Sequence, residues 1–180
     1  GCGLLMKKPD GFLRAVAAEQ GMALSERYAV GMVFLNQQAA LAGRARRCLE
    51  DELAREGLAV AGWRVVPTYT AACGEEALKT LPVIEQIFIN LPEAMDEAAG
   101  ERHLYVARRR TEKAVGPDDD TFYVPSLSAR VIAYKGLIMP DNLPAFFTVV
   151  ILADALVGKD CSLGSSATAA LIYSRLDSPD

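Results

Sequence analysis

Histidine is almost absent from this sequence, and cysteine is scarce. The 180 residues include one histidine, His103, and four cysteines, at positions 2, 48, 73 and 161, with no CxxC pair. Zinc sites are usually built from closely spaced cysteine and histidine ligands, so we expect no metal site. His103 stands at a predicted helix start, where a surface or capping role is favoured. We interpret the cysteines as reduced thiols of a cytoplasmic protein.

The scarcity of histidine also bears on hydrolytic chemistry. A serine nucleophile needs a base, usually a histidine, within hydrogen-bond reach. Ser126 and Ser128 are polar residues in a predicted extended segment, but His103 has no plausible relation to either of them. The sequence therefore does not support a serine nucleophile.

An excess of positive charge and a long apolar run are missing as well. There are 19 lysine and arginine residues against 23 aspartate and glutamate residues, which gives a net charge of −4. Nucleic acids are bound through a basic surface, so nucleic acid is not expected as the main partner. The longest apolar stretch, residues 146–157, contains Asp154 and is shorter than the roughly 20 residues that span a bilayer. We expect no membrane segment.

The first residues do not resemble a secretion signal. Lys7 and Lys8 follow an apolar stretch, whereas a signal peptide has its positive charges in front. Gly1 is not an initiator residue. We therefore expect the sequence to begin inside a longer precursor, after processing, or after residues that are not shown.

Hydrophobic periodicity predicts a mixture of helices and strands. Helices are expected at 9–20, 37–56, 74–81 and 102–115, and strands at 28–35, 58–66, 83–89 and 122–134. In residues 28–35 the odd-numbered and the even-numbered positions are both apolar, which indicates a strand covered on both faces. Residues 93–100 are polar and expected to be irregular, and 103–106 could form a short strand instead of the helix start.

The order of these elements predicts the fold class. From Tyr28 to Tyr134 it is strand, helix, strand, strand, helix, strand, as in the split βαβ arrangement of ferredoxin-like folds. We therefore predict an α+β fold with an antiparallel βαββαβ sheet and both long helices on one face. An N-terminal helix and an unassigned C-terminal tail are added to it. Leu49 and Leu53 lie on the apolar stripe of the second helix and are expected in the core.

Residues 122–134 are predicted to form one long extended segment. Pro125 within it indicates an edge strand, a bulge or a break. The polar residues that follow alternate with apolar ones, as in a strand with one face toward water: Ser126, Ser128 and Arg130. Lys135-Gly136 is interpreted as turn chemistry that ends the segment.

Three groups of polar residues could carry chemistry, and each has a simpler interpretation. Glu75, Glu76 and Glu85 could be paired carboxylates, but acidic residues are also typical of a solvated first helical turn. Arg108–Arg110 could bind phosphate, but neighbouring helix residues point about 100° apart, which favours a solvated or partner-facing surface. Residues 158–166 are rich in glycine and serine without matching GxxxxGK[ST], so we expect a loop.

Four stretches, in order, resemble a single known family. They are GCGLLMKKPDGFLR, RYAVGMVFLN, the run from GWRVVP through IEQIFIN to RHLYVARRRTEK, and YVPSLSARVIAYKGL. Together they resemble the N-terminal class II glutamine amidotransferase region of the glutamate synthase large subunit. The resemblance covers residues 1–147, with a core at 28–136. Residues 148–180 are expected to be a tail that does not match the family.

The resemblance implies a part in making glutamate from glutamine and 2-oxoglutarate. The parent family uses FMN, an iron–sulphur cluster and a nicotinamide-linked small subunit, and no motif for any of them occurs in this chain. The partners implied are the rest of the large subunit and the small subunit. Whether the chain forms a homo-oligomer is left open.

One catalytic candidate, Cys2, also follows from the resemblance. Class II amidotransferases use an N-terminal cysteine followed by glycine, and the α-amino group of that cysteine acts as base. Here Gly1 precedes Cys2, so the residue with the thiol does not carry the free amine. The family's glutamine-binding motifs, HxRFSTN and NGE, are not found. We therefore predict no catalytic, cofactor-binding or metal-binding residue, and no activity of the chain alone.

A second hypothesis comes from a different class of protein. The chain could be a ferredoxin-like binding or dimerisation module without catalysis. An intact nucleophile upstream would favour the amidotransferase hypothesis. A free-standing gene that begins near Gly1 and encodes a stable dimer would favour the module.

Overall fold

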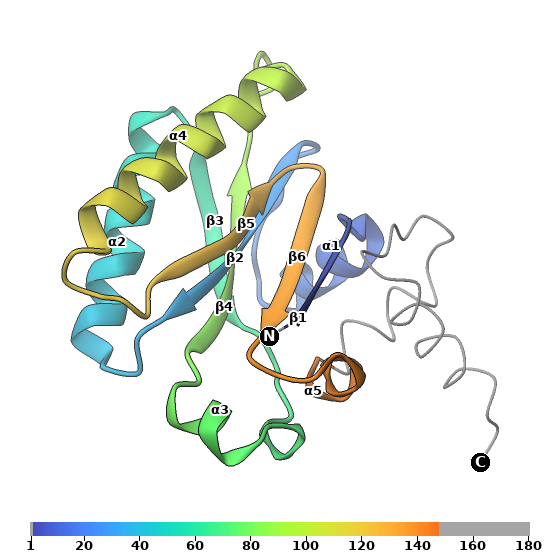
Figure 1. The fold of residues 1–180 in the computed structure, drawn as a ribbon. Helices are drawn as coiled ribbons and strands as arrows, with labels where there is room; N and C mark the ends of the chain where they lie inside the picture. Colours follow the sequence, from blue (N-terminus) through green and yellow to red (C-terminus); the bar gives the residue numbers. More distant parts are fainter. Residues whose placement is uncertain (1, 148–180) are drawn as a thin grey trace, which may run out of the picture.

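A four-stranded antiparallel sheet lies between a pair of long helices and a second layer built from both ends of the described chain (Figure 1). The computed structural model describes residues 2–147. Gly1 and the predicted tail at 148–180, with its loop at 158–166 and Cys161, lie outside the described residues. Helices and antiparallel sheets occur together, as the sequence predicts for an α+β protein.

The central sheet contains β2 (Tyr28–Leu35), β3 (Ala59–Val65), β4 (Val83–Asn90) and β5 (Tyr123–Ser128). Their order is β3-β4-β2-β5, and each neighbouring pair is antiparallel. β5 is thus an edge strand, where a proline such as Pro125 is tolerated because one side of the backbone needs no partner. The register of β2 with β5 shifts between Met32 and Phe34. Three predicted strands are confirmed: 28–35, 58–66 and 83–89.

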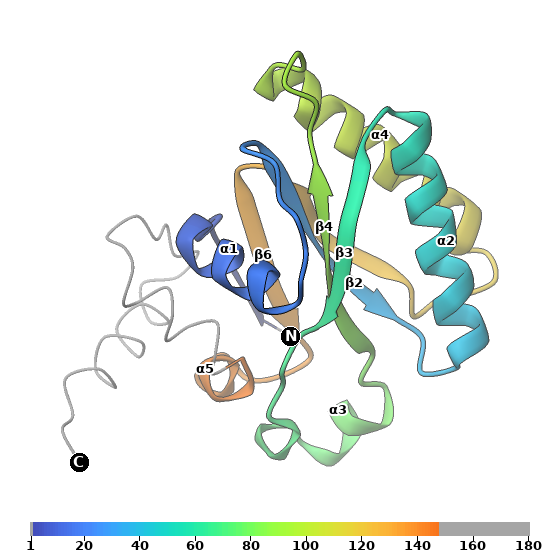
Figure 2. The same cartoon turned by 180° about the vertical axis from the view of Figure 1, so that it is seen from behind.

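Helices α2 (Ala39–Arg55) and α4 (Glu97–Val115) lie side by side on one face of this sheet (Figure 1 and Figure 2). Leu49 and Leu53 are 0% exposed in the core between helices and sheet, which confirms the predicted apolar stripe. α2 stops at Gly57, which has a φ of 74°, and the N–H of Leu58 returns to the carbonyl of Leu53. Glycine favours this left-handed conformation at a helix end.

The start of α2 differs from the prediction in one detail. The helix was predicted from residue 37, but it begins at Ala39, and the residue before it is Gln38. The Asn36 side chain accepts a hydrogen bond from the N–H of Gln38 and donates another to Asp119. It therefore fixes the loop that leads into the helix.

The start of α4 lies earlier than predicted. The helix begins at Glu97, because the Asp96 side chain accepts a hydrogen bond from the N–H of Ala99 at 2.7 Å. The irregular segment predicted at 93–100 is therefore wrong from residue 97 onward. The alternative strand at 103–106 is wrong as well.

The second layer covers the opposite face of the sheet (Figure 2). It contains β1 (Cys2–Lys7) paired antiparallel with β6 (Val131–Gly136), together with α1 (Asp10–Glu19) and α5 (Leu143–Phe146). α1 is the helix predicted at 9–20, and Gly21 ends it with a φ of 70°. The apolar side chains of this layer meet those of β2 and β4 in a second core, which includes Leu4, Met6, Leu13, Val30, Phe88, Tyr134 and Phe147.

The remaining elements are short. The helix predicted at 74–81 is found as α3 (Glu75–Lys79). Single 3₁₀ turns occur at Thr70–Ala72 and Pro140–Asn142.

The single extended segment predicted at 122–134 is wrong, because it forms two strands in two different sheets. β5 ends at Ser128, and β6 starts at Val131 and pairs with β1. The chain turns here because the Ser128 hydroxyl accepts hydrogen bonds from the N–H groups of Arg130 (3.0 Å) and Val131 (3.2 Å). That hydroxyl donates in turn to Glu101 of α4 at 3.0 Å. Ser128 is therefore buried and does not face water.

Two further features differ from the sequence analysis. Residues 2–7 were assigned no element, yet they form β1, whose partner strand β6 lies at the far end of the described chain. Ser126 was placed on a wet face, but it is 6% exposed, and its hydroxyl accepts a hydrogen bond from the N–H of Ala133 at 3.0 Å. Both features depend on the packing of β6 against β5.

Position 31, in the middle of β2, is occupied by glycine because a larger residue would clash with its neighbours. A Cβ atom at this position would lie 2.6 Å from Leu127 of β5 and 2.7 Å from Ile87 of β4. These two side chains come from strands on either side of β2 and meet over its backbone. Any larger residue would push them apart under the helices.

We expect Leu53→Ala to lower the free energy of unfolding by about 2–5 kcal/mol, because it removes fully buried atoms and leaves a cavity between α2 and the sheet. Urea denaturation followed by circular dichroism measures the change. Leu137→Ala truncates a side chain that is 67% exposed and should cost less than about 0.5 kcal/mol. An unchanged midpoint for Leu53→Ala would show that α2 presents a different face to the core.

Candidate functional site

A pocket of ≈ 850 Å³ opens at the end of the β1–β6 sheet. One wall is formed by the paired ends of β1 and β6, and the others by β2, β5 and the segment around α3. Polar groups and thiols reach it from several elements: Cys2, Cys73, Lys79, Asp120, Thr121, Tyr123 and Lys135. Most of its remaining lining is apolar, as in typical small-molecule sites.

Two thiols, Cys2 and Cys73, line this pocket. β1 places Cys2 opposite Gly136 of β6, at the edge of the two-stranded sheet. Burial raises the pKa of the Cys2 thiol and that of the Cys73 thiol above their ordinary values. A raised pKa keeps more of the thiol protonated at neutral pH, and the thiolate is the reactive form.

Lys135 and Tyr123 supply the polar contact at the mouth of the pocket. The Nζ of Lys135 donates to the hydroxyl of Tyr123 at 3.2 Å and lies 5.0 Å from the centre of its ring. Phe34 packs edge-on against the same ring, with 6.0 Å between ring centres. The sequence analysis treated Lys135-Gly136 as a turn, which is wrong, because both residues belong to β6 and line the pocket.

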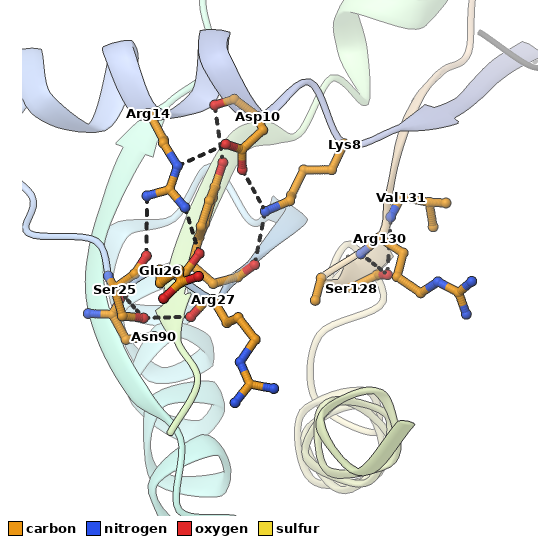
Figure 3. A network of polar contacts seen from close by, with 12 residues as sticks. Lys8, Asp10, Arg14, Ser25, Glu26, Arg27, Asn90, Ser128, Arg130 and Val131 are labelled. Atoms are coloured by element: carbon orange, nitrogen blue, oxygen red, sulfur yellow. Dashed lines mark hydrogen bonds and ion pairs between the residues drawn. The ribbon is translucent and has the colours of Figure 1, made fainter. Parts of the chain in front are cut away.

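A second polar cluster joins the start of α1 to β2 (Figure 3). The Nζ of Lys8 donates to Asp10 (3.2 Å) and to the backbone carbonyl of Tyr28 (3.1 Å), and it lies 3.3 Å above the Tyr28 ring. Arg14 donates to Asp10 (2.8 Å) and to the carbonyls of Ser25 (3.2 Å) and Glu26.

The contacts of this cluster are internal to the protein. Burial lowers the pKa of Lys8, although its hydrogen bond to Asp10 opposes that effect. Burial raises the pKa of Tyr28 far above its ordinary range. Because the cations already use their donors on the chain itself, we interpret the cluster as an anchor that fixes α1 against β2.

The candidate carboxylates are not brought together in one acid–base pair. Glu75 and Glu76 are exposed in the first turn of α3, and Glu76 forms an ion pair with Lys79. Glu85 is buried on β4 and accepts two hydrogen bonds from Arg46 of α2. The arrangement agrees with the interpretation of Glu75 and Glu76 as a solvated helix start.

The arginine run on α4 does not converge on one point. Arg108 and Arg109 both donate to Glu112, at 2.8 Å and 2.6 Å, whereas Arg110 donates to Glu56 of α2 at 2.7 Å. These contacts leave no common space in which a phosphate could be held by all three. The sequence prediction that all three side chains splay holds for Arg110 only, because Arg108 and Arg109 share the Glu112 carboxylate.

His103 joins the two long helices and lies away from the pocket. Its Nδ1 is 2.7 Å from the Glu56 carboxylate of α2. Within residues 2–147, no group of three or more His, Cys, Asp or Glu side chains is arranged to hold a metal ion. The same part of the chain has no helix with the length and apolar character needed to cross a bilayer.

Several side chains that matter in the structure carried no sequence signal. Arg46 of α2 ion-pairs with buried Glu85, and nothing in the periodicity of its helix singles it out. Arg64 and Gln86, both buried on the central sheet, were read only as parts of strands. A charged residue inside an otherwise apolar strand, as in GWRVV, is the one local sign that could have singled out Arg64.

Comparison with known proteins shows where these residues belong. A sequence model of the family described as "Glutamine amidotransferases class-II" matches residues 1–156. The glutamate synthase [NADPH] large chain of Bacillus subtilis is 36% identical over 149 residues, which cover 82% of this chain and 10% of that protein. The ferredoxin-dependent glutamate synthase 1 of Arabidopsis thaliana is 34% identical over 151 residues, or 82% of this chain and 9% of that protein.

A third relative agrees with these two. The glutamate synthase [NADPH] large chain of Azospirillum brasilense is 38% identical over 150 residues, covering 82% of this chain and 10% of that protein. The chain thus spans about a tenth of the length of the relatives it matches. Since the family model covers most of the sequence, the chain belongs to the class II glutamine amidotransferases.

Proposed function

We propose that this chain is part of the glutamine amidotransferase domain of a glutamate synthase and serves glutamate synthesis and ammonia assimilation. The observation that carries the proposal is the family match over residues 1–156, together with similarity to glutamate synthases along 82% of the chain. Residues 1–147, with a core at 28–136, form part of that domain. They supply its α/β insertion and one wall of a pocket, while the hydrolytic centre lies elsewhere in the domain.

The strand order supports the proposal that residues 1–147 form an insertion and not the hydrolytic centre. The order β3-β4-β2-β5, with α2 and α4 on one face, is the strand order expected for a ferredoxin-like βαββαβ unit. The β1–β6 sheet on the other face is then the part that joins this insertion to the rest of the amidotransferase domain. Its end carries the pocket that Cys2 lines.

Cys2 lines that pocket as a bystander thiol. Its backbone nitrogen is bonded to Gly1, so it has no free α-amino group to act as a base. Burial raises the pKa of the thiol, which lowers the fraction of reactive thiolate. Both facts oppose the role of an activated nucleophile.

Cofactors and partners are assigned to other regions of the larger protein. The donor groups of residues 2–147 do not fit an iron–sulphur cluster, which needs several cysteines close together. We propose that FMN and the cluster are bound elsewhere, and that this chain contacts the rest of a large subunit with its small subunit in the cytoplasm.

The purified 180-residue chain should not release glutamate from glutamine above the background rate. Hydrolysis needs a base for the nucleophile, a clamp for the substrate carboxylate and donors for the oxyanion, and losing a nucleophile alone removes several orders of magnitude of rate. A coupled glutamate dehydrogenase assay measures the release. Cys2→Ala and its pocket neighbour Cys73→Ala form a matched pair. Turnover that Cys2→Ala abolishes and Cys73→Ala preserves would make Cys2 the nucleophile.

The thiol of Cys2 should also react slowly with iodoacetamide. Because burial raises its pKa, the rate of alkylation should still be rising at about pH 9, where a free cysteine with a pKa of about 8.5 is mostly ionised. Mass spectrometry of the Cys2 peptide, with a free cysteine peptide as reference, gives the rate at each pH. A midpoint below about pH 8 would instead indicate an activated thiol.

A further inference from the structure

Two neighbouring residues of β4 meet arginines on opposite faces of the central sheet. Successive side chains of a strand point to opposite faces, so Glu85 faces the helices and Gln86 faces the second layer. On the helix side, Arg46 of α2 donates through Nε and Nη2 to the two carboxylate oxygens of Glu85, with the Nε bond at 2.7 Å. This is the bidentate geometry that matches an arginine to a carboxylate.

On the other face, the corresponding edge of an arginine has no acceptor among residues 2–147. Arg64 of β3 lies directly opposite Gln86 in the strand register and is 9% exposed. Its Nε and Nη2 atoms are buried, and neither has a hydrogen-bond partner in the described part of the chain. The ring of Phe12, on α1, has its centre 5.9 Å from the guanidinium carbon.

An unpaired acceptor accompanies these unpaired donors. The Nε2 of Gln86 donates to the hydroxyl of Tyr134 at 3.2 Å, but its Oε1 is buried without a donor among residues 2–147. Buried polar groups are nearly always hydrogen-bonded, and a buried charge without a partner is strongly unfavourable. Burial lowers the pKa of Arg64, and the charge of Glu19 and the hydroxyl of Tyr134 offset that effect only in part. Within residues 2–147, two donors on one arginine edge and one acceptor on its register partner in β4 thus lack partners.

We propose that Arg64 and Gln86 form a binding site for a small molecule that carries a carboxylate next to an N–H donor, as a free α-amino acid does. The carboxylate takes the Nε/Nη2 edge of Arg64 in the way Glu85 takes that of Arg46. The ammonium group donates to the Oε1 of Gln86. Phe12, which is only partly buried, is the cover that moves aside for the ligand to enter.

This site is separate from the pocket beside Cys2. None of Arg64, Gln86, Tyr134 and Phe12 lines that pocket. The inference therefore stands apart from the proposed function, and a negative glutaminase assay has no bearing on it.

The test compares L-alanine with propionate, which has the same carbon skeleton without the ammonium group. The melting temperature of the purified 180-residue chain should rise by about 3 °C or more at saturating L-alanine, and less with propionate. Sodium chloride at equal concentration should have no such effect. An equal rise with chloride and with L-alanine would overturn the proposal, because it would reflect general salt stabilisation.

Matched variants assign the effect to the site. Arg64→Met should abolish the response to L-alanine, whereas Arg46→Met removes an arginine edge that is already filled and should keep it. Gln86→Met should erase the difference between L-alanine and propionate. A response that persists in Arg64→Met would refute the site.

A direct measurement keeps the inference testable where a variant fails to fold. The Nε–Hε signal of Arg64 in an arginine-selective NMR spectrum of the unaltered protein should shift as L-alanine is added. Arg64→Lys keeps the charge but loses the planar edge, and it should need at least tenfold more ligand. An Arg64 signal that does not move at saturating L-alanine would show that no amino acid binds there.

Discussion

The burial of strand β2 on both faces is the constraint on which the other elements depend. Ala29 and Val33 point into the core under α2 and α4, while Val30 and Met32 point into the core under α1 and the β1–β6 sheet. An inner strand of this kind must be covered on each side, because an uncovered apolar face would stay exposed to water. The two long helices cover one face, and the two ends of the described chain come together to cover the other (Figure 2).

A sheet between two dry layers makes every polar side chain on it depend on a partner. Glu85 obtains one from Arg46, and the Ser126 hydroxyl obtains one from the backbone of β6. Arg64, on the edge strand β3, and Gln86, on β4, depart from this rule, since two donors of Arg64 and the Oε1 of Gln86 have no partner in residues 2–147. Natural proteins keep such departures mainly at sites of function, which favours a binding role for this position.

The family relationship concerns the larger protein, whereas the pocket concerns this portion of it. The relatives place the chain within the class II amidotransferases, but it spans about a tenth of their length. The pocket at the end of β1 and β6 shows what this portion contributes locally, which is a largely apolar wall with two half-buried thiols and the Lys135–Tyr123 pair. Burial raises the pKa of both thiols above the ordinary value of a cysteine.

The sequence by itself determined the elements whose signals are local. Two such signals are the 3.6-residue stripe that contains Leu49 and Leu53 and the strand at 28–35, which is apolar on both faces. Each is contained within a few neighbouring residues. The resemblance to the family was also found from the sequence, because four motifs occur in the family's order. The candidate site was predictable only in part: Cys2 was singled out, but its pocket was not.

Only the tertiary structure decided what depends on distant partners. β1 exists because β6 returns to pair with it, and the segment at 122–134 breaks because Ser128 and Glu101 of α4 bind the turning backbone. The contrast between Glu85, which pairs with Arg46, and Arg64, whose Nε and Nη2 have no acceptor in residues 2–147, is equally absent from the sequence pattern. Hydrogen bonds and burial between residues far apart in the chain arise only when the layers pack, so no local pattern records them.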